Sequence, residues 1–222
     1  FVVSLFAQPQ NAHVTAQADG PQPVVRAALQ NDTSLPLSEL SAQLGALQPD
    51  AGVKFEVLPA QRIPRDPLSY TAVGDDALQM APTLPRMPSP LADFEGVGNI
   101  SGVMPPDTQG DIGYDPISGR KFYVQWVNLA FQIWDVSDPA VPVSLLGPVV
   151  GNTLWQGFGG ACETTNDGDP ITLFDSMAKR WLMSQFAFPN GSGHGPYYQC
   201  IAISQTADPT GAWYRYAFLA SD

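Results

Sequence analysis

The residues of this chain that could carry chemistry are concentrated in the stretch ACETTNDGDP, residues 161–170. It places three carboxylates, Glu163, Asp167 and Asp169, beside a cysteine and ahead of an apolar segment. Two carboxylates at a suitable separation are what a glycoside hydrolase needs, so these three are the candidate catalytic residues of a secreted, glycosidase-like hydrolase. The sequence contains no group of arginines that would hold a carboxylate substrate. Hydrolysis is therefore the alternative interpretation, and no catalytic residue is assigned.

Calcium is a second interpretation of the acidic residues, since this ion takes six to eight oxygen ligands. Another acidic loop, DTQGD at 107–111, offers Asp107 and Asp111 to the same ion as Asp167 and Asp169. Neither loop matches an EF-hand, because in DTQGDIGYDPIS the glycine stands at position 4 and a serine takes the place of the bidentate glutamate. A polar turn whose side chains bond their own backbone remains a third interpretation.

Two cysteines, Cys162 and Cys200, are present in the chain. An even pair in an acidic, secreted chain predicts one disulfide, and two free buried thiols are the alternative. The histidines, His13 and His194, are far apart and each stands alone, so a structural zinc site is not expected. A disulfide would tie the acidic stretch to the later segment YYQCIAIS.

The net charge and composition of the chain argue against nucleic-acid-binding, helix-rich and membrane-spanning proteins. The chain has 10 Lys and Arg against 21 Asp and Glu, a net charge of −11 that repels phosphate backbones, so nucleic acid is not an expected partner. The 22 Pro and 20 Gly disfavour a helix-rich protein. No run beyond the N-terminus approaches the roughly 18 consecutive apolar residues of a membrane helix, and we expect no membrane span.

The N-terminal part differs in amino-acid composition from the rest of the chain. FVVSLF at 1–6 and the A-Q-A at 16–18 predict that residues 1–18 are the end of a signal peptide, with a frayed apolar terminus as the alternative. Residues 19–95 carry prolines every few positions and predict a pro-region or linker, mostly irregular. Leucines at helical spacing, Leu40, Leu44 and Leu47, predict one short helix within it. The predicted signal peptide implies a secreted or cell-surface location.

From residue 96 onward, aromatic and β-branched runs alternate with Gly, Asp, Asn and Pro, which is typical of strands and turns. Three strand pairs are expected, at 122–128 with 131–136, 171–175 with 181–188, and 197–205 with 214–220. A weak repeat relates GDIGYDPISGRKFYVQWV to GDPITLFDSMAKRWLMSQF. We therefore predict an all-β fold, a partial β-propeller of four-stranded antiparallel blades over residues 96–222 that continues beyond them.

Aromatic residues suggest one further site. Most of the five tryptophans fall in expected strands, so packing between blades is their expected role. Trp155 differs, because TLWQGFGG is rich in glycine and resembles a loop. An exposed Trp155 together with Phe158 would stack on the face of a sugar.

Three long motifs, PPDTQGDIG, FGGACETTNDGDPITLFDSMAKRWLMSQF and PYYQCIAISQTADPTGAWYRYAF, resemble an uncharacterised family of secreted bacterial proteins. Members have a propeller-like N-terminal region, often followed by immunoglobulin-like or fibronectin-like modules. The resemblance implies an extracellular location and a propeller, but no activity; YDPISGRK at 114–121 departs from the family's shorter connection. The expected function is an extracellular module that binds a carbohydrate or surface component or has a structural role.

Overall fold

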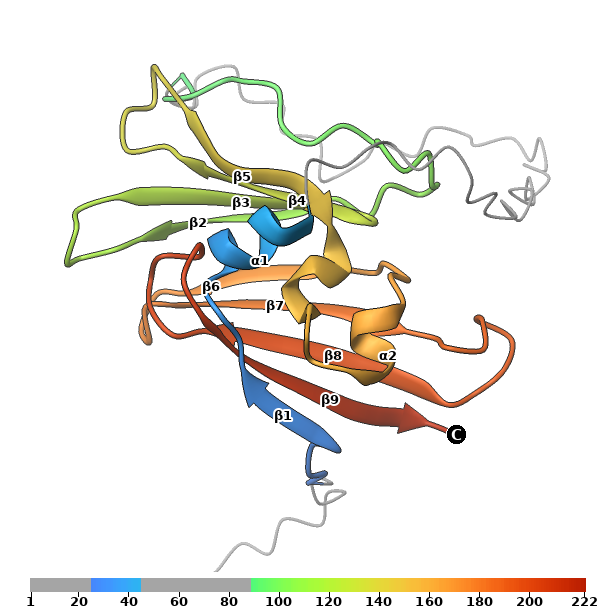
Figure 1. The fold of residues 1–222 in the computed structure, drawn as a ribbon. Helices are drawn as coiled ribbons and strands as arrows, with labels where there is room; N and C mark the ends of the chain where they lie inside the picture. The colour runs from blue at the N-terminus through green and yellow to red at the C-terminus, as the bar shows by residue number, and fades with distance from the viewer. Residues whose placement is uncertain (1–24, 45–88) are drawn as a thin grey trace, which may run out of the picture.

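The computed structural model describes residues 25–44 and 89–222. The predicted signal peptide and residues 45–88 of the predicted linker lie outside the described residues. Two antiparallel sheets are stacked on one another (Figure 1). The mostly β class is thus confirmed, while the described residues form no closed propeller.

Sheet 1 is a four-stranded meander whose strands follow one another in sequence order: β2 (Gln109–Tyr114), β3 (Lys121–Val127), β4 (Ala130–Asp135) and β5 (Val143–Val150). Sheet 2 repeats this order with β6 (Ile171–Asp175), β7 (Arg180–Ala187), β8 (Tyr197–Ser204) and β9 (Trp213–Ser221), and adds β1 (Gln30–Thr33) beside β9. The three strand pairs expected from the sequence are confirmed as β3 with β4, β6 with β7 and β8 with β9.

The internal repeat appears in the structure as two equivalent hairpin turns. Asp115 Oδ1 accepts a hydrogen bond from the backbone N–H of Ile117 at 2.9 Å, and Asp175 Oδ1 accepts one from that of Met177 at 2.8 Å. Bonds of this kind favour the charged form, and they lower the pKa of both carboxyls, for Asp115 chiefly through the hydroxyl of Ser118. The aspartates of the repeat therefore shape the turns between β2 and β3 and between β6 and β7.

Alternate residues of facing strands build the core between the sheets. Phe122, Val124 and Trp126 of β3 are fully buried, as are Trp181 and Met183 of β7. A glycine of β2 lies directly against the inner face of sheet 2. A Cβ atom added to Gly113 would lie 2.5 Å from Cζ2 of Trp181, so no larger residue fits there without displacement.

Two segments of the predicted pro-region or linker, at 30–33 and 37–44, pack against the domain that follows. β1 pairs with β9 in register from Gln30 opposite Ala217 to Thr33 opposite Tyr214. The predicted short helix is present as α1 (Leu37–Leu44), although it begins earlier than the leucine spacing indicated. Its Leu37 and Leu40 are buried in the core, and this burial explains why a proline-rich segment is ordered here.

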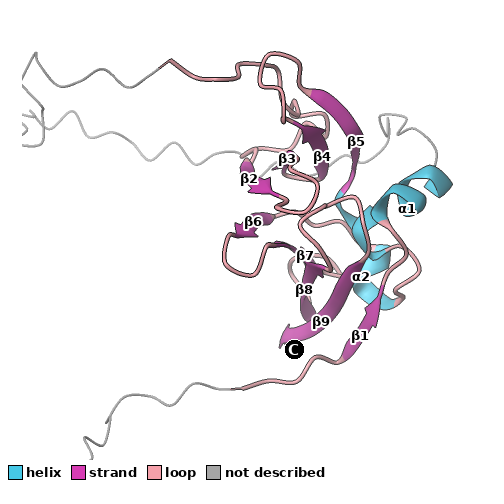
Figure 2. Ribbon diagram, turned by 90° about the vertical axis from the view of Figure 1, so that its left-hand side faces the viewer, coloured by secondary structure: helices cyan, strands magenta, loops and turns pink. Residues whose placement is uncertain are grey.

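Two short helical turns connect sheet 1 to sheet 2. The 3-10 turn η1 (Gly151–Trp155) follows β5, and α2 (Gly160–Thr164) precedes β6. Figure 2 shows α1 and α2 on one side of sheet 2, while no described element covers the other side. The acidic stretch of the sequence begins on α2 and continues into the loop before β6.

Candidate functional site

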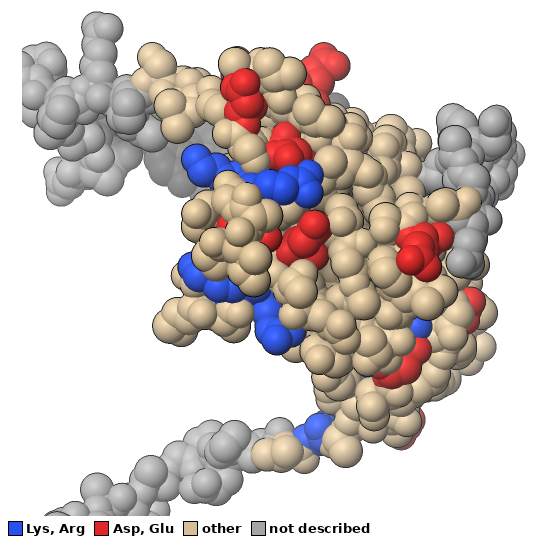
Figure 3. Space-filling view, turned by 60° about the vertical axis from the view of Figure 1, so that its left-hand side comes forward, with Lys and Arg blue, Asp and Glu red and all other residues tan. Residues whose placement is uncertain are grey.

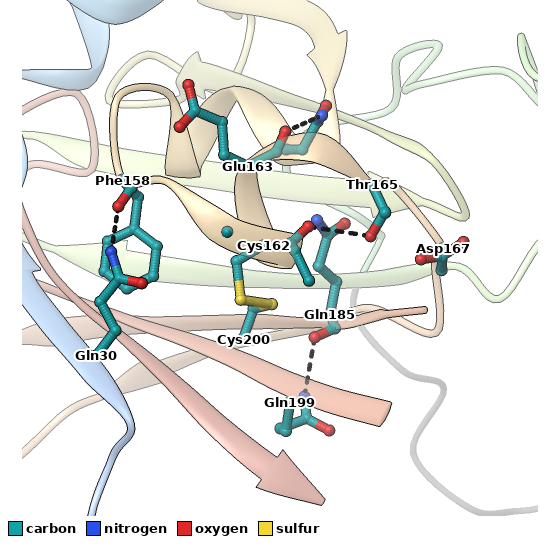
Figure 4. The surroundings of a disulfide bond; sticks show 12 residues. Gln30, Phe158, Cys162, Glu163, Thr165, Asp167, Gln185, Gln199 and Cys200 are labelled. Carbon is teal, nitrogen blue, oxygen red and sulfur yellow. Dashed lines mark hydrogen bonds between the residues drawn. A yellow bond between two sulfur atoms is a disulfide. The ribbon is translucent and has the colours of Figure 1, made fainter. Parts of the chain in front are cut away.

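The disulfide between Cys162 and Cys200 is confirmed, and it fastens α2 to the centre of β8 (Figure 4). The two Cα atoms are 5.8 Å apart, within the usual range for a disulfide. Both cysteines are buried, and Gln185 of β7 points toward the same layer. The start of the acidic stretch is thereby held against sheet 2.

The carboxylate of Glu163 is hydrogen-bonded to the loop that precedes α2. One carboxylate oxygen accepts the backbone N–H of Gly157 at 2.8 Å and the other accepts that of Gly159 at 2.6 Å. The backbone carbonyl of Glu163 accepts a further hydrogen bond from the amide of Asn152 at 2.7 Å. This side chain closes a glycine-rich loop, which accounts for its position without a catalytic role.

Asp111 and Asp167 likewise bond to backbone N–H groups. Asp111 Oδ2 accepts the N–H of Phe174 at 2.8 Å, which joins β2 of sheet 1 to β6 of sheet 2. Asp167 Oδ2 accepts the N–H of Phe188 at 2.6 Å, just past the end of β7. Of the four proposed calcium ligands, Asp111 therefore connects two strands, and Asp167 connects the loop before β6 to the residue after β7.

The remaining two, Asp107 and Asp169, come together with Asn128 at one end of the sheets, and we call these three residues the rim cluster. Asn128 is buried and donates from its amide to the carbonyl of Pro105 at 2.8 Å and to Asp107 Oδ2 at 3.3 Å. Burial, and secondly the charge of Asp107, raise the pKa of Asp169 above its usual value. The two carboxylates are thus electrostatic neighbours.

All three residues of the rim cluster have an unusual backbone conformation, which they share with Lys179 of the β6–β7 turn. Asp107, Asn128 and Asp169 have φ values of 43°, 47° and 47°, in the left-handed region that non-glycine residues seldom adopt. Such conformations cost free energy and gather at functional sites. Within the described ranges, however, no group of three or more His, Cys, Asp or Glu side chains is arranged to hold a metal ion.

The prediction that Trp155 and Phe158 form an exposed surface for stacking on a sugar is wrong. Trp155 is 0% exposed and Phe158 is 4% exposed, so neither ring has a face for a ligand. The turn η1 inserts Trp155 into the core, and the guanidinium of Arg215 lies 5.3 Å from the ring centre of Phe158. The glycines around them shape tight turns. The other tryptophans, Trp126, Trp134, Trp181 and Trp213, are all buried, and Trp134 packs against Tyr123 and Phe94 on the outer face of sheet 1.

A groove of about 680 Å³ lies on the outer face of sheet 1, under the segment 89–97. Phe94 meets the rings of Tyr123 and Trp134 edge-on, with centroids 6.0 and 5.6 Å away. Gln125 fixes this segment by accepting the N–H of Val97 at 2.7 Å. Residues up to 95 have the composition of a linker, so the sequence does not predict this groove; the isolated aromatic residue Phe94 is the one signal that points to it.

Charged side chains are interspersed on the face shown in Figure 3, with the basic groups close to acidic ones. Arg120 exemplifies this, because its guanidinium is 2.8 Å from Asp135 and 3.8 Å from Asp208. Burial opposes ionisation of Asp135, but hydrogen bonds from Ser137 and Arg120 outweigh it and lower its pKa. The positive charge of this arginine is therefore neutralised locally.

Comparisons of the chain with models of protein families, with curated proteins and with solved structures found no match. None of the helices in the described ranges is long and apolar enough to span a membrane.

Proposed function

We propose that this chain is a secreted or cell-surface module, part of a β-propeller, whose role is to bind or to support other structure and not to catalyse a reaction. The observation that carries the proposal is the set of hydrogen bonds made by the acidic side chains of the chain. Glu163 and Asp111 accept backbone N–H groups with both carboxylate oxygens, and Asp167 does so with one, and these bonds hold loops and strands together. A catalytic carboxylate needs a free oxygen facing a substrate.

The propeller is supported by the relation between the two sheets. Each is a four-stranded meander in sequence order, and the first strands of the two, β2 and β6, lie against each other. The equivalent turns at Asp115 and Asp175 repeat the same local structure in each sheet. Repetition of one sheet unit with its first strand innermost is the organisation of propeller blades.

An extracellular location is supported by the disulfide, which is stable in oxidising compartments and rare in the cytosol. The groove on sheet 1 is the surface we assign to the ligand, an extracellular carbohydrate or surface component. Its aromatic wall, Phe94 and Tyr123, suits the apolar face of a sugar ring, and Lys121 and Asp93 supply polar groups beside it.

The test is co-sedimentation with insoluble polysaccharides, including cellulose, chitin and peptidoglycan. We expect the native chain to bind at least one of them, and Tyr123→Ala to weaken that binding about tenfold or more, because removing a stacking ring costs on the order of 1 to 2 kcal/mol. Tyr214→Ala, which removes an exposed tyrosine from sheet 2, is the matched control. Equal binding of both variants would reject the groove, and absence of binding to every polymer would reject a carbohydrate ligand.

A hydrolase remains the second candidate, because burial and the charge of the neighbouring carboxylate Asp107 shift the pKa of Asp169 upward, which is the direction that a general acid requires. Release of reducing ends from the same polysaccharides distinguishes the two. Turnover that disappears in Asp169→Asn but persists in Glu95→Gln would establish the hydrolase and overturn the binding role.

Calcium at the rim cluster is tested by thermal unfolding with calcium and then with excess chelator, while the disulfide stays oxidised. Stabilisation of several degrees that Asp169→Asn abolishes would support a bound ion, since a ligand of the folded state raises the unfolding temperature. Identical unfolding in both conditions would remove calcium from the proposal.

A further inference from the structure

Four hairpin turns of the two sheets lie at one end of the molecule, which we call the turn end. They connect β2 to β3, β4 to β5, β6 to β7 and β8 to β9, at residues 115–120, 136–142, 176–179 and 205–212. The two sheets share this end, because the guanidinium of Arg120 in the first turn lies 3.8 Å from Asp208 in the last (Figure 1). The turn end is therefore a single surface to which both sheets contribute.

Two of these turns present a large apolar side chain at the same position of the internal repeat. Ile117 stands two residues after Asp115, and Met177 stands two residues after Asp175. These side chains are 95% and 92% exposed, and Val141 in the turn between β4 and β5 is 61% exposed. One exposed apolar side chain is ordinary on a protein surface. Its recurrence at equivalent positions of two turns at the same end indicates a contact surface.

The backbone of both turns is hydrogen-bonded within the turn itself. Asp115 Oδ1 accepts the N–H of Ile117, and Asp175 Oδ1 accepts the N–H of Met177 and, at 2.9 Å, that of Ala178. A backbone N–H group without a partner is costly in an apolar medium. Because their aspartates already bond these donors, the two turns can place their apolar side chains in such a medium at a lower cost.

Two cations follow the apolar residue in each turn. They are Arg120 and Lys121 in the first turn and Lys179 and Arg180 in the second, four of the six Lys and Arg among the described residues. Acidic side chains lie close to the basic ones on this side of the molecule (Figure 3). Five aspartates lie in or beside the turns, namely Asp115, Asp135, Asp138, Asp175 and Asp208. The charges of the turn end thus nearly balance, although the whole chain has a net charge of −11.

We propose that the turn end docks on the surface of a lipid bilayer, where Ile117 and Met177 enter the boundary between headgroups and acyl chains. Apolar side chains that project singly from turns suit this partner, because lipid surrounds each of them, whereas a protein would need a matched pocket for each. The neighbouring lysines reach the phosphates while their alkyl stems lie along apolar groups. Nearly balanced charge favours zwitterionic headgroups, since an anionic surface repels the net negative charge of the chain.

Sedimentation with phosphatidylcholine vesicles tests the proposal. Two apolar side chains should bind no more tightly than a single myristoyl chain, whose association constant is about 10⁴ M⁻¹, so we expect the chain 1–222 to bind at about 1 mM lipid. Ile117→Ser and Met177→Ser should each weaken binding by about tenfold, because each removes one buried apolar side chain. Ile171→Ser, which changes a 43% exposed residue at the opposite end of β6 from Met177, is the matched control and should bind like the native chain.

Three outcomes of this experiment would overturn the proposal. They are absence of vesicle binding by the native chain, equal binding by the double variant Ile117→Ser, Met177→Ser, and an equal loss in the control. Binding that the double variant retains would assign it to another part of the chain, such as the apolar residues 1–6. Both substituted positions are exposed, so the urea unfolding midpoints of all variants should agree with that of the native chain.

A fluorescent label shows which end meets the lipid. Both native cysteines are in the disulfide, so an introduced cysteine is the only free thiol. Met177→Cys, labelled with a fluorophore whose emission depends on polarity, should shift to shorter wavelength with vesicles. Ser192→Cys, in the exposed connection between β7 and β8 at the opposite end, should not change. Equal shifts at both positions, or no shift at Met177→Cys, would refute docking by the turn end.

Vesicles that contain phosphatidylglycerol separate insertion from attraction by charge. Insertion predicts binding that is equal to or weaker than binding to pure phosphatidylcholine, and that persists in high salt. Binding only to the anionic vesicles, lost in high salt, would mean electrostatic adsorption and would overturn the proposal. Polysaccharide binding through Tyr123 is measured without lipid, so the failure of either activity leaves the other to be judged on its own result.

Discussion

Removal of Asp32 should strongly destabilise the fold, although this residue lies in the segment expected to be a linker. Its two carboxylate oxygens accept hydrogen bonds from the guanidinium of Arg215, one from Nε at 2.8 Å and one from Nη2 at 2.6 Å. The same guanidinium donates to the carbonyls of Leu154 and Gln156 at 3.2 and 2.8 Å. One buried cation thereby joins β1, β9 and η1.

The size of the effect follows from the burial of the two partners. The side chain of Arg215 is 4% exposed and that of Asp32 is 34% exposed. Asp32→Ala leaves a buried guanidinium without its counterion, a change that costs about 3 to 5 kcal/mol when both partners are buried. Because Asp32 is partly hydrated, we expect the lower end, about 3 kcal/mol. With a urea m-value of about 2 kcal/mol per molar, the midpoint should fall by about 1.5 M.

The assay is urea unfolding followed by circular dichroism, with Glu95→Ala as a control. Glu95 is also acidic and is exposed, so its loss should change the free energy of unfolding by less than about 0.5 kcal/mol. Combining Asp32→Ala with Arg215→Met should recover stability relative to Asp32→Ala alone, since no unpaired charge remains buried. If Asp32→Ala behaves like Glu95→Ala, β1 is not held by this ion pair and the reasoning is wrong.

The remaining predictions concern the disulfide, the contact of Gly113 with sheet 2, and the rim cluster. Joint replacement of Cys162 and Cys200 by alanine should lower the free energy of unfolding by about 4 kcal/mol through loop entropy, measured by urea unfolding. Gly113→Ala should cost about 2 kcal/mol by forcing the tryptophan of β7 to move, whereas Gly98→Ala, with open space around it, should be close to neutral. Because the pKa of Asp169 is raised, the folded chain binds a proton at this carboxyl more tightly than the unfolded chain does. The contribution of Asp169 to the free energy of unfolding therefore falls as the pH rises above 3.8, its ordinary pKa. Asp169→Asn should therefore be more stable than the native chain at pH 7 but not below about pH 3; an equal difference at both pH values would contradict the pKa shift.

Local sequence patterns were sufficient for the three predicted strand pairs, whereas β1, β2 and β5 were not assigned from the sequence. The repeat around Asp115 and Asp175 predicted two equivalent hairpins because an aspartate carboxylate bonds N–H groups within two or three residues of itself. The disulfide was predictable because the chain has only one pair of cysteines, Cys162 and Cys200. The longer connection YDPISGRK, which departs from the resembling family, closes with the same type of turn as its counterpart.

Site predictions were less successful, because carboxylates close in sequence were assumed to face a common point. Glu163 and Asp167 bond to different loops, while Asp169 lies beside Asp107, which is distant in sequence. Trp155 was expected on the surface because glycines surround it, yet those glycines allow the tight turns that carry it into the core.

The sequence by itself determined the elements whose causes are local: strands from alternating residues, turns from Asp, Gly and Pro, and one disulfide from one pair of cysteines. Only the tertiary structure decided that β1 and α1 join the core, since their burial depends on Arg215 and on surfaces of β9 and η1. It also decided which carboxylates are free, because hydrogen-bond partners such as Phe174 for Asp111 come from another sheet. Partners that meet through the packing of sheets have no fixed spacing along the chain, so no local pattern predicts them.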